Sequence, residues 1–162
     1  MIKFADIRQK YDVLIRQQQE ECTRYQQLIK RITDHLKDSL ELEQPTWIGP
    51  EGRVVHDYVF LASPHQEKPT EPTELYNLIP DETGMLAFSV GITVDSSPVS
   101  FPKRTLFIPV ILRRQENAFL LSIGNKFETT LSETPSTAEL SCVSEAIKRM
   151  AISVLDAYIL TK

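Results

Sequence analysis

The chain has 162 residues, is 41% hydrophobic and 25% charged, and carries a formal net charge of -4 at pH 7. Such a chain is typical of one globular domain, residues 1–162, that buries a core without disulfides or metal ions. Its acidic balance argues against nucleic-acid binding. Phosphate recognition needs clustered Lys and Arg, and here these residues are interleaved with Asp and Glu.

The sequence predicts neither a targeting segment nor a membrane span. Its start, MIKFADIRQK, lacks the apolar run of a secretory signal, and no stretch approaches the roughly eighteen apolar residues of a membrane helix. A cytoplasmic protein that does not bind membranes is therefore expected. Cys22 and Cys142 fall within predicted helices without Cys-x-x-Cys spacing, which favours reduced, buried thiols over a disulfide.

Residues 1–43 are predicted to form one long helix. Apolar residues recur three or four positions apart along it, as one helical face requires: Ile7, Tyr11, Leu14, Cys22, Tyr25, Ile29, Ile32, Leu36 and Leu40. Such a helix is roughly 58 Å long, whereas a domain built from the remaining residues is about 35 Å across. We therefore expect the helix to bend or to overhang the domain, and an overhanging apolar stripe needs a partner.

The period of this stripe separates a packed helix from a coiled coil. A strict heptad register from Phe4 through Tyr11 reaches the polar Gln18 and further polar residues, whereas a slower drift keeps nearly every position apolar. This difference favours a straight helix on its own sheet, or beside other helices, over a long coiled coil. Residues 16–24 are almost wholly polar, so a hinge or a protruding end is expected to begin there.

Residues 46–132 are predicted to form an antiparallel sheet of about four to five strands. A short strand at Trp47 and a strand over 53–62 flank a Gly-Pro-Glu-Gly turn. The segment 85–94 alternates between a large apolar face and a small face, which is typical of a strand with helices on one side. The large residues are Leu86, Phe88, Val90, Ile92 and Val94, and the small ones are Ala87, Ser89, Gly91 and Thr93.

Two further runs complete the predicted sheet. Residues 105–112 are apolar on both faces but include Pro109, which cannot donate to a ladder, so we expect an edge strand or a bulge. Residues 115–117 are predicted to be a hairpin turn that leads into a strand over 118–131.

The segment 63–83 is the least regular part of the sequence. It holds four prolines and is long for a connection within a compact domain. One interpretation is a mobile surface loop. The other is that its Leu-Tyr-Asn-Leu-Ile stretch, residues 75–79, folds as a short helical turn over one end of the sheet and covers a pocket or joins an interface.

A second helix is predicted over 134–160. It begins with either Thr134 as the cap or with Ser136 and Glu139 as a capping box, and its apolar stripe faces the first helix and the sheet. The expected fold class is therefore α+β, an antiparallel meander with long N-terminal and C-terminal helices packed on one face.

No catalytic, cofactor or metal site is predicted. His56 and Asp57 are strand neighbours that point to opposite faces, and His35 borders the stripe of the first helix, where a half-buried structural role is expected. Metal binding needs three or four converging ligands, and the spacing of the three histidines does not supply them. The best enzymatic candidate is a cluster of His65, Asp81 and Glu82, brought together by the long loop.

Function is therefore predicted from the long helix. The first hypothesis is a non-catalytic protein-interaction and assembly domain, a homodimer or a partner of another protein, that binds through the N-terminal helix. Its predicted partner-binding residues are Ile7, Tyr11, Leu14 and Gln18. The alternatives are a small-molecule-binding sensory domain of PAS-like or GAF-like architecture, with a ligand beneath residues 63–83, and a secretion-type chaperone.

Overall fold

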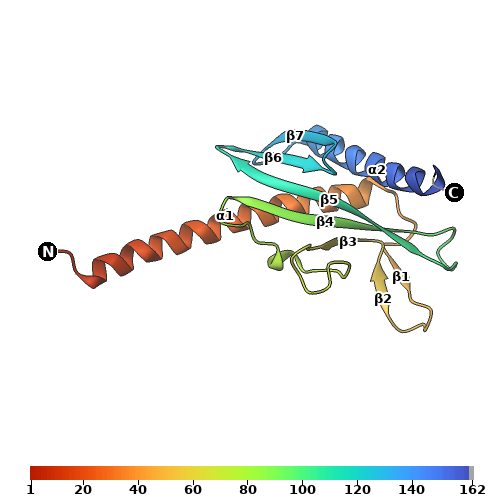
Figure 1. The fold of residues 1–162 in the computed structure, drawn as a ribbon, viewed down its shortest axis with the longest axis horizontal. Helices are drawn as coiled ribbons and strands as arrows, with labels where there is room; N and C mark the ends of the chain where they lie inside the picture. The colour runs from red at the N-terminus through yellow and green to blue at the C-terminus, as the bar shows by residue number, and fades with distance from the viewer. Residues whose placement is uncertain (161–162) are drawn as a thin grey trace.

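The computed structural model describes residues 1–160 and has the predicted α+β fold, with a helix at each end of the chain around antiparallel sheets (Figure 1). The elements in chain order are α1 (Phe4–Ser39), β1 (Thr46–Ile48), β2 (Val55–Asp57), β3 (Val59–Ala62), the 3-10 turn η1 (Leu75–Asn77), β4 (Met85–Val94), β5 (Arg104–Gln115), β6 (Ala118–Ile123), β7 (Phe127–Ser132) and α2 (Thr137–Leu160).

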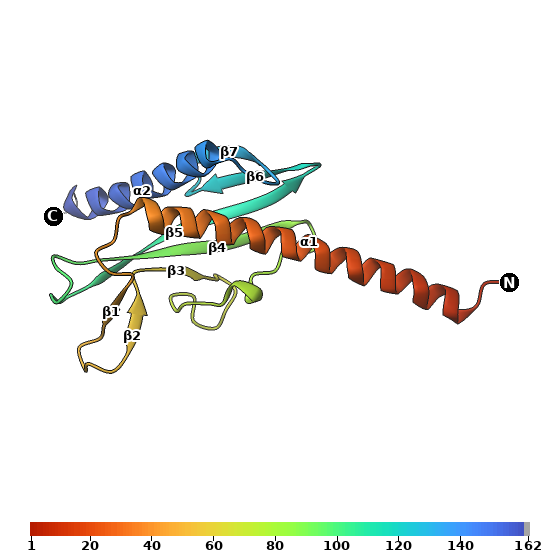
Figure 2. The same ribbon diagram turned by 180° about the vertical axis from the view of Figure 1, so that it is seen from behind.

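The main sheet is a meander in which each strand pairs with the next, in the order β3-β4-β5-β6-β7. Both helices lie on one side of this sheet, and Figure 2 shows α1 crossing in front of β4 and β5. The core between the two layers combines one face of each helix with alternate residues of the strands. Its largest fully buried side chains include Tyr25, Phe88 and Phe119.

The alternation of β4 follows the prediction. Its large apolar residues face the helices and are buried, except for the partly buried Val94 at the strand end, while its small residues form the opposite face of the sheet. Gly91 is needed there because a Cβ atom at this position would lie within 2.6 Å of Cε2 of Phe60, whose ring covers the glycine from β3. This part of the small face is filled by the chain itself.

The prediction of one continuous strand over residues 53–62 is wrong. The chain instead makes two strands: β2 pairs with β1 in a separate hairpin, and β3 joins the main sheet beside β4. The change occurs at Tyr58, whose N–H donates to Pro45 O and whose carbonyl accepts from Thr93 N. A continuous β-branched and aromatic run does not reveal such a change of partner.

The placement of Pro109 at an edge or bulge is also wrong, because β5 is the central strand of the sheet. Pro109 faces Ser89 across the β4 pairing, and its carbonyl accepts from Gly124 N, one residue beyond the end of β6. The N–H that proline lacks would point toward β6, but the pairing between β5 and β6 ends at Val110, the next residue. At Pro109 itself, β5 is therefore paired as a strand only with β4, as an edge strand would be.

The single strand predicted over residues 118–131 is in fact the β6–β7 hairpin. Gly124 and Asn125 both have positive φ angles, 59° and 58°, as the two central residues of a type I′ turn require. Glycine and asparagine tolerate this conformation best, so the Gly-Asn pair was a usable turn signal that the apolar alternation on either side concealed.

The C-terminal helix starts at the Ser136 and Glu139 capping box and not at Thr134. Glu139 N–H donates to Ser136 Oγ at 3.2 Å, and a hydrogen bond from Ser132 N–H holds the pKa of the Glu139 carboxyl below its ordinary value. His35 has the predicted structural role, since its ring nitrogens lie 2.8 Å and 3.3 Å from hydroxyls of Ser144 and Ser141 on α2.

The irregular segment contains a helical turn, as one interpretation predicted, but the turn packs on α1 and not over an end of the sheet. Gln26 of α1 donates its side-chain amide to the backbone oxygens of Tyr76 and Leu78, at 3.4 Å and 3.1 Å. Leu78 is buried in the core, whereas Tyr76 and Ile79 are exposed. This contact brings the segment to the place where α1 leaves the sheet.

Candidate functional site

The most unusual feature is the N-terminal half of α1, which projects from the body as a continuous helix without a hinge (Figures 1 and 2). The buried residues of α1 begin at Tyr25, and residues 4–20 are exposed apart from the partly covered Ile15. Seventeen residues correspond to roughly 25 Å of helix. The polar segment 16–24 is thus the start of a protruding end.

The overhang carries an uncovered apolar stripe. Its members recur at heptad spacing and keep large exposed fractions: Phe4 68%, Ile7 58%, Tyr11 58% and Leu14 47%. The guanidinium of Arg8 lies 4.9 Å from the centre of the Phe4 ring. Three of the predicted partner-binding residues, Ile7, Tyr11 and Leu14, lie on this stripe.

The base of the overhang is fixed to the body by Tyr25. Its side chain is fully buried, and its hydroxyl donates to Gly84 O and accepts from Arg114 N at 3.0 Å. Burial raises the pKa of this phenol, so it stays protonated and able to donate at physiological pH. Tyr25 therefore joins α1 to β5 and to the turn before β4.

An ion-pair network strengthens the same junction. The Glu21 carboxylate lies 3.1 Å from Arg114 Nε and 3.0 Å from Arg24 Nη1, and Arg114 also pairs with Glu133 after β7. The Arg114 side chain is mostly buried and stacks over the ring of Phe119. Glu21 is thus already neutralised by two cations and holds the helix at a set angle to the sheet.

Beside this junction lies a groove of about 450 Å³ that the sequence did not predict. We name it the base groove; α1 contributes Gln18, Glu21, Cys22 and Tyr25, and the irregular segment contributes Ile79, Pro80, Asp81, Glu82 and Gly84. The predicted partner-binding residue Gln18 therefore lies at its edge. Burial raises the pKa of the Cys22 thiol, which keeps it protonated and unreactive.

The rim of the base groove is acidic. Hydrogen bonds from the Thr83 hydroxyl and from Met85 N hold the pKa of Asp81 below its ordinary value, so this exposed carboxylate remains charged. Glu82 next to it is also exposed. Residues 1–17 have the opposite sign, with four basic and two acidic side chains, although the chain as a whole carries -4.

The predicted enzymatic cluster is only partly assembled. His65 and Asp81 line one small cavity of about 120 Å³ with Ser63, whereas Glu82 belongs to the base groove. The backbone N–H of His65 donates to Ser63 Oγ, and the Asp81 carboxylate accepts hydrogen bonds from Thr83 in its own turn. Within residues 1–160 there is also no group of three potential metal ligands.

A second charged cluster binds the β1–β2 hairpin to the main sheet. The Lys103 ammonium lies 2.5 Å from Asp95 Oδ2 and is enclosed by the rings of Trp47, Tyr58 and Phe101, at 5.3, 5.7 and 5.2 Å from their centres. Tyr58 donates its hydroxyl to the same carboxylate at 2.6 Å. The chain's own lysine fills this aromatic cage, so the cluster acts as a structural clasp.

The part of the chain that the structure describes contains no helix with the length and apolar character needed to cross a bilayer. Comparisons with protein-family models, with curated proteins and with solved structures found no match to this chain. The candidate site therefore consists of the overhanging stripe and the base groove, and its function has to be argued from their geometry.

Proposed function

We propose that this protein is a non-catalytic assembly module that forms a homodimer through the overhanging half of α1. The observation that carries the proposal is the exposed stripe of Phe4, Ile7, Tyr11 and Leu14, which the rest of residues 1–160 leaves uncovered. Contiguous exposed apolar surface of this kind marks interaction sites on folded proteins.

The spacing of the stripe supports a helical partner. Successive members lie three, four and three residues apart, the heptad alternation that places side chains on one seam between two helices. Beyond Gln18 the buried positions of α1 follow the longer period of a helix packed on its own sheet. The change of period within one helix agrees with a change of partner, from the body to a second helix.

Helix stability gives the proposal a second support. An isolated helix shorter than about 12–15 residues is marginal in water, and most helical stability in proteins comes from packing of an apolar face. The overhang is only slightly longer than this limit, and the single covered residue among its first seventeen helical positions is Ile15, which is partly covered. Pairing with a second copy would supply the missing packing.

The test is sedimentation equilibrium of the full chain and of two full-length variants. Ile7→Asp combined with Leu14→Asp places charges on the seam, and we expect dimerisation at least about a hundredfold weaker, because each buried unpaired charge costs more than 1 kcal/mol. Val13→Asp is the matched control, since Val13 is 45% exposed but lies off the stripe. A monomeric full chain, or equal weakening by both changes, contradicts the proposal.

The ligand-sensor alternative has less support from the geometry. The cavity between the irregular segment and β4, where the ligand was expected, is about 120 Å³, whereas pockets for small organic ligands are about 300–1,000 Å³. The base groove is larger, about 450 Å³, but it is lined by α1 and not by the sheet. The sheet face that was expected to leave room is occupied at Gly91 by the ring of Phe60. A chaperone-like role is compatible with the same stripe, and partner proteins that compete with dimerisation would indicate it.

A further inference from the structure

We infer that two copies of this chain pair in antiparallel orientation, so that the first turn of each α1 enters the base groove of the other copy. This inference rests on the proposed homodimer and specifies its geometry. The occupant of the base groove is residues 1–8 of a second copy, and three observations support this choice.

The first observation is the length of the overhang. In an antiparallel pair centred between Tyr11 and Leu14, each Tyr11 packs on Leu14 of the second copy. In this alignment, a residue of one helix lies opposite the residue of the other helix for which the two numbers sum to about 25. Phe4 therefore lies opposite Glu21 of the second copy. Glu21 lines the base groove. The overhang is therefore long enough to bring its N-terminal turn to the groove, and both grooves are filled by the same symmetric pairing.

The second observation is the sign of the charges beside the stripe. Lys3, Arg8 and Lys10 flank the seam at the heptad e and g positions, while Asp6 and Asp12 lie away from it. A parallel pair would place Lys3 of each copy beside Arg8 of the other, where two like charges repel. An antiparallel pair instead carries Lys3 toward the acidic rim of Asp81 and Glu82.

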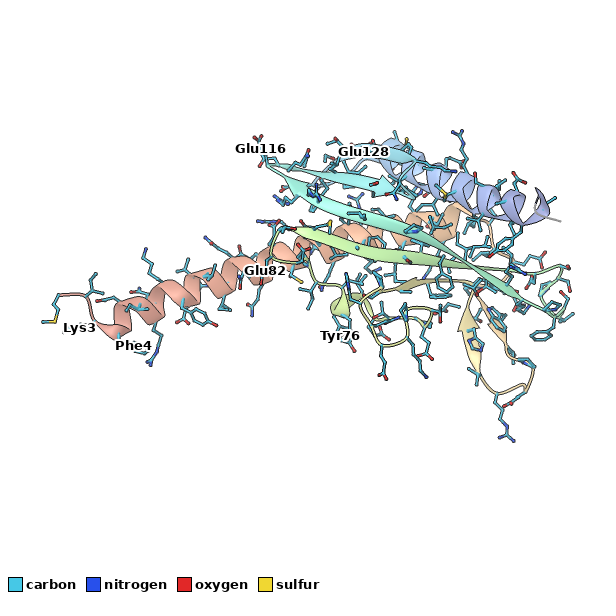
Figure 3. All side chains as sticks on the ribbon, in the orientation of Figure 1. Lys3, Phe4, Tyr76, Glu82, Glu116 and Glu128 are labelled. Carbon is cyan, nitrogen blue, oxygen red and sulfur yellow. The ribbon has the colours of Figure 1, made fainter. Side chains whose placement is uncertain are left out.

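The third observation is that apolar residues of the irregular segment line the groove and that the start of the chain presents exposed apolar side chains. Ile79 keeps 65% of its surface exposed beside the groove, and Pro80 lies next to it. Ile2 and Phe4, at 79% and 68% exposed, are the apolar side chains that would reach this place. Figure 3 shows Lys3 and Phe4 at the far end of the helix, and Tyr76 and Glu82 where the helix leaves the body.

The orientation is tested by disulfide cross-linking between single-cysteine variants, in full chains with Cys22→Ser and Cys142→Ser. Lys10→Cys and Gln17→Cys are made separately, one with an affinity tag, then mixed and oxidised. In the antiparallel pair these g positions are neighbours across the seam, so we expect the mixed dimer to be the main covalent product. Each variant oxidised alone should give much less covalent dimer.

The matched control is the mixture of Lys10→Cys with Ile15→Cys, which are neighbours across the seam in a parallel pair. If this mixture cross-links and the first does not, while sedimentation still shows a dimer, the antiparallel inference is overturned and the proposed homodimer stands. If sedimentation shows only a monomer, the proposed function itself has failed. The two failures are therefore distinguishable.

The contact with the base groove is tested by exchanging charges. Glu82 is exposed, so Glu82→Lys should leave the fold intact and weaken dimerisation at least about threefold, because two symmetric ion pairs are reversed. Lys3→Glu should do the same. The double variant should recover the native dissociation constant, with Glu128→Lys as a distant control. If the double variant does not recover the native dissociation constant, or if Glu128→Lys weakens dimerisation as much as Glu82→Lys, the assignment of the groove is overturned.

Discussion

Removal of the Tyr25 hydroxyl should destabilise the whole fold, although it deletes one atom and leaves the aromatic packing unchanged. In Tyr25→Phe, the ring keeps its edge contact with Phe119, 5.0 Å between centres. The carbonyl of Gly84 and the N–H of Arg114 both lose their hydrogen-bond partner. Each unsatisfied buried backbone group costs about 1–3 kcal/mol.

Both backbone groups belong to partly exposed residues, so the lower half of that range applies. We expect the free energy of unfolding to fall by roughly 2–4 kcal/mol, which lowers Tm by about 5–15 °C in a chain of this size. The assay is urea denaturation followed by circular dichroism. Tyr76→Phe is the control, because Tyr76 is 69% exposed. A loss below about 0.5 kcal/mol in Tyr25→Phe refutes the account of the junction.

Two further predictions concern the sheet and the clasp. Gly91→Ala should lower the unfolding midpoint because its methyl group overlaps the Phe60 ring, and Phe60→Leu in the same chain should recover part of the loss. Hydrogen bonds from Lys103 and then from Tyr58 hold the pKa of Asp95 in the folded protein below its ordinary value. The stability that this carboxylate contributes is therefore complete above about pH 4 and is lost as the pH falls through the pKa of the folded state. The midpoint should therefore fall more steeply between about pH 4 and 2 in the native chain than in Asp95→Asn, and parallel curves would contradict this.

The elements with strong local patterns were predictable from the sequence. The strand at 85–94 alternates without interruption, and the Ser136 and Glu139 capping box marks the start of α2 within one residue. The first helix was predicted to end at residue 43, whereas α1 ends at Ser39. Its apolar spacing identified the stripe, and length alone indicated an overhang or a bend.

Long-range pairing was less accessible, because no local pattern records which strand a residue meets. The change of sheet at Tyr58 depends on contacts with Pro45 and Thr93, far away in sequence. Pro109 is tolerated in the central strand because β6 ends opposite it, which depends on the length of a neighbouring strand. The base groove escaped prediction for the same reason, since it combines α1 with residues 79–84 through the turn held by Gln26.

The unbroken passage of α1 from core to overhang also fixes the rotational phase of the stripe relative to the body. Insertion of one residue within 16–24 would rotate Phe4 and its stripe about the helix axis by roughly 100° with respect to the sheet, without altering either apolar face. Insertion of seven residues would restore the direction of the stripe and move it outward by about 10 Å. The spacing between the last buried turn and the first exposed one is therefore itself a determinant of how two bodies can be oriented.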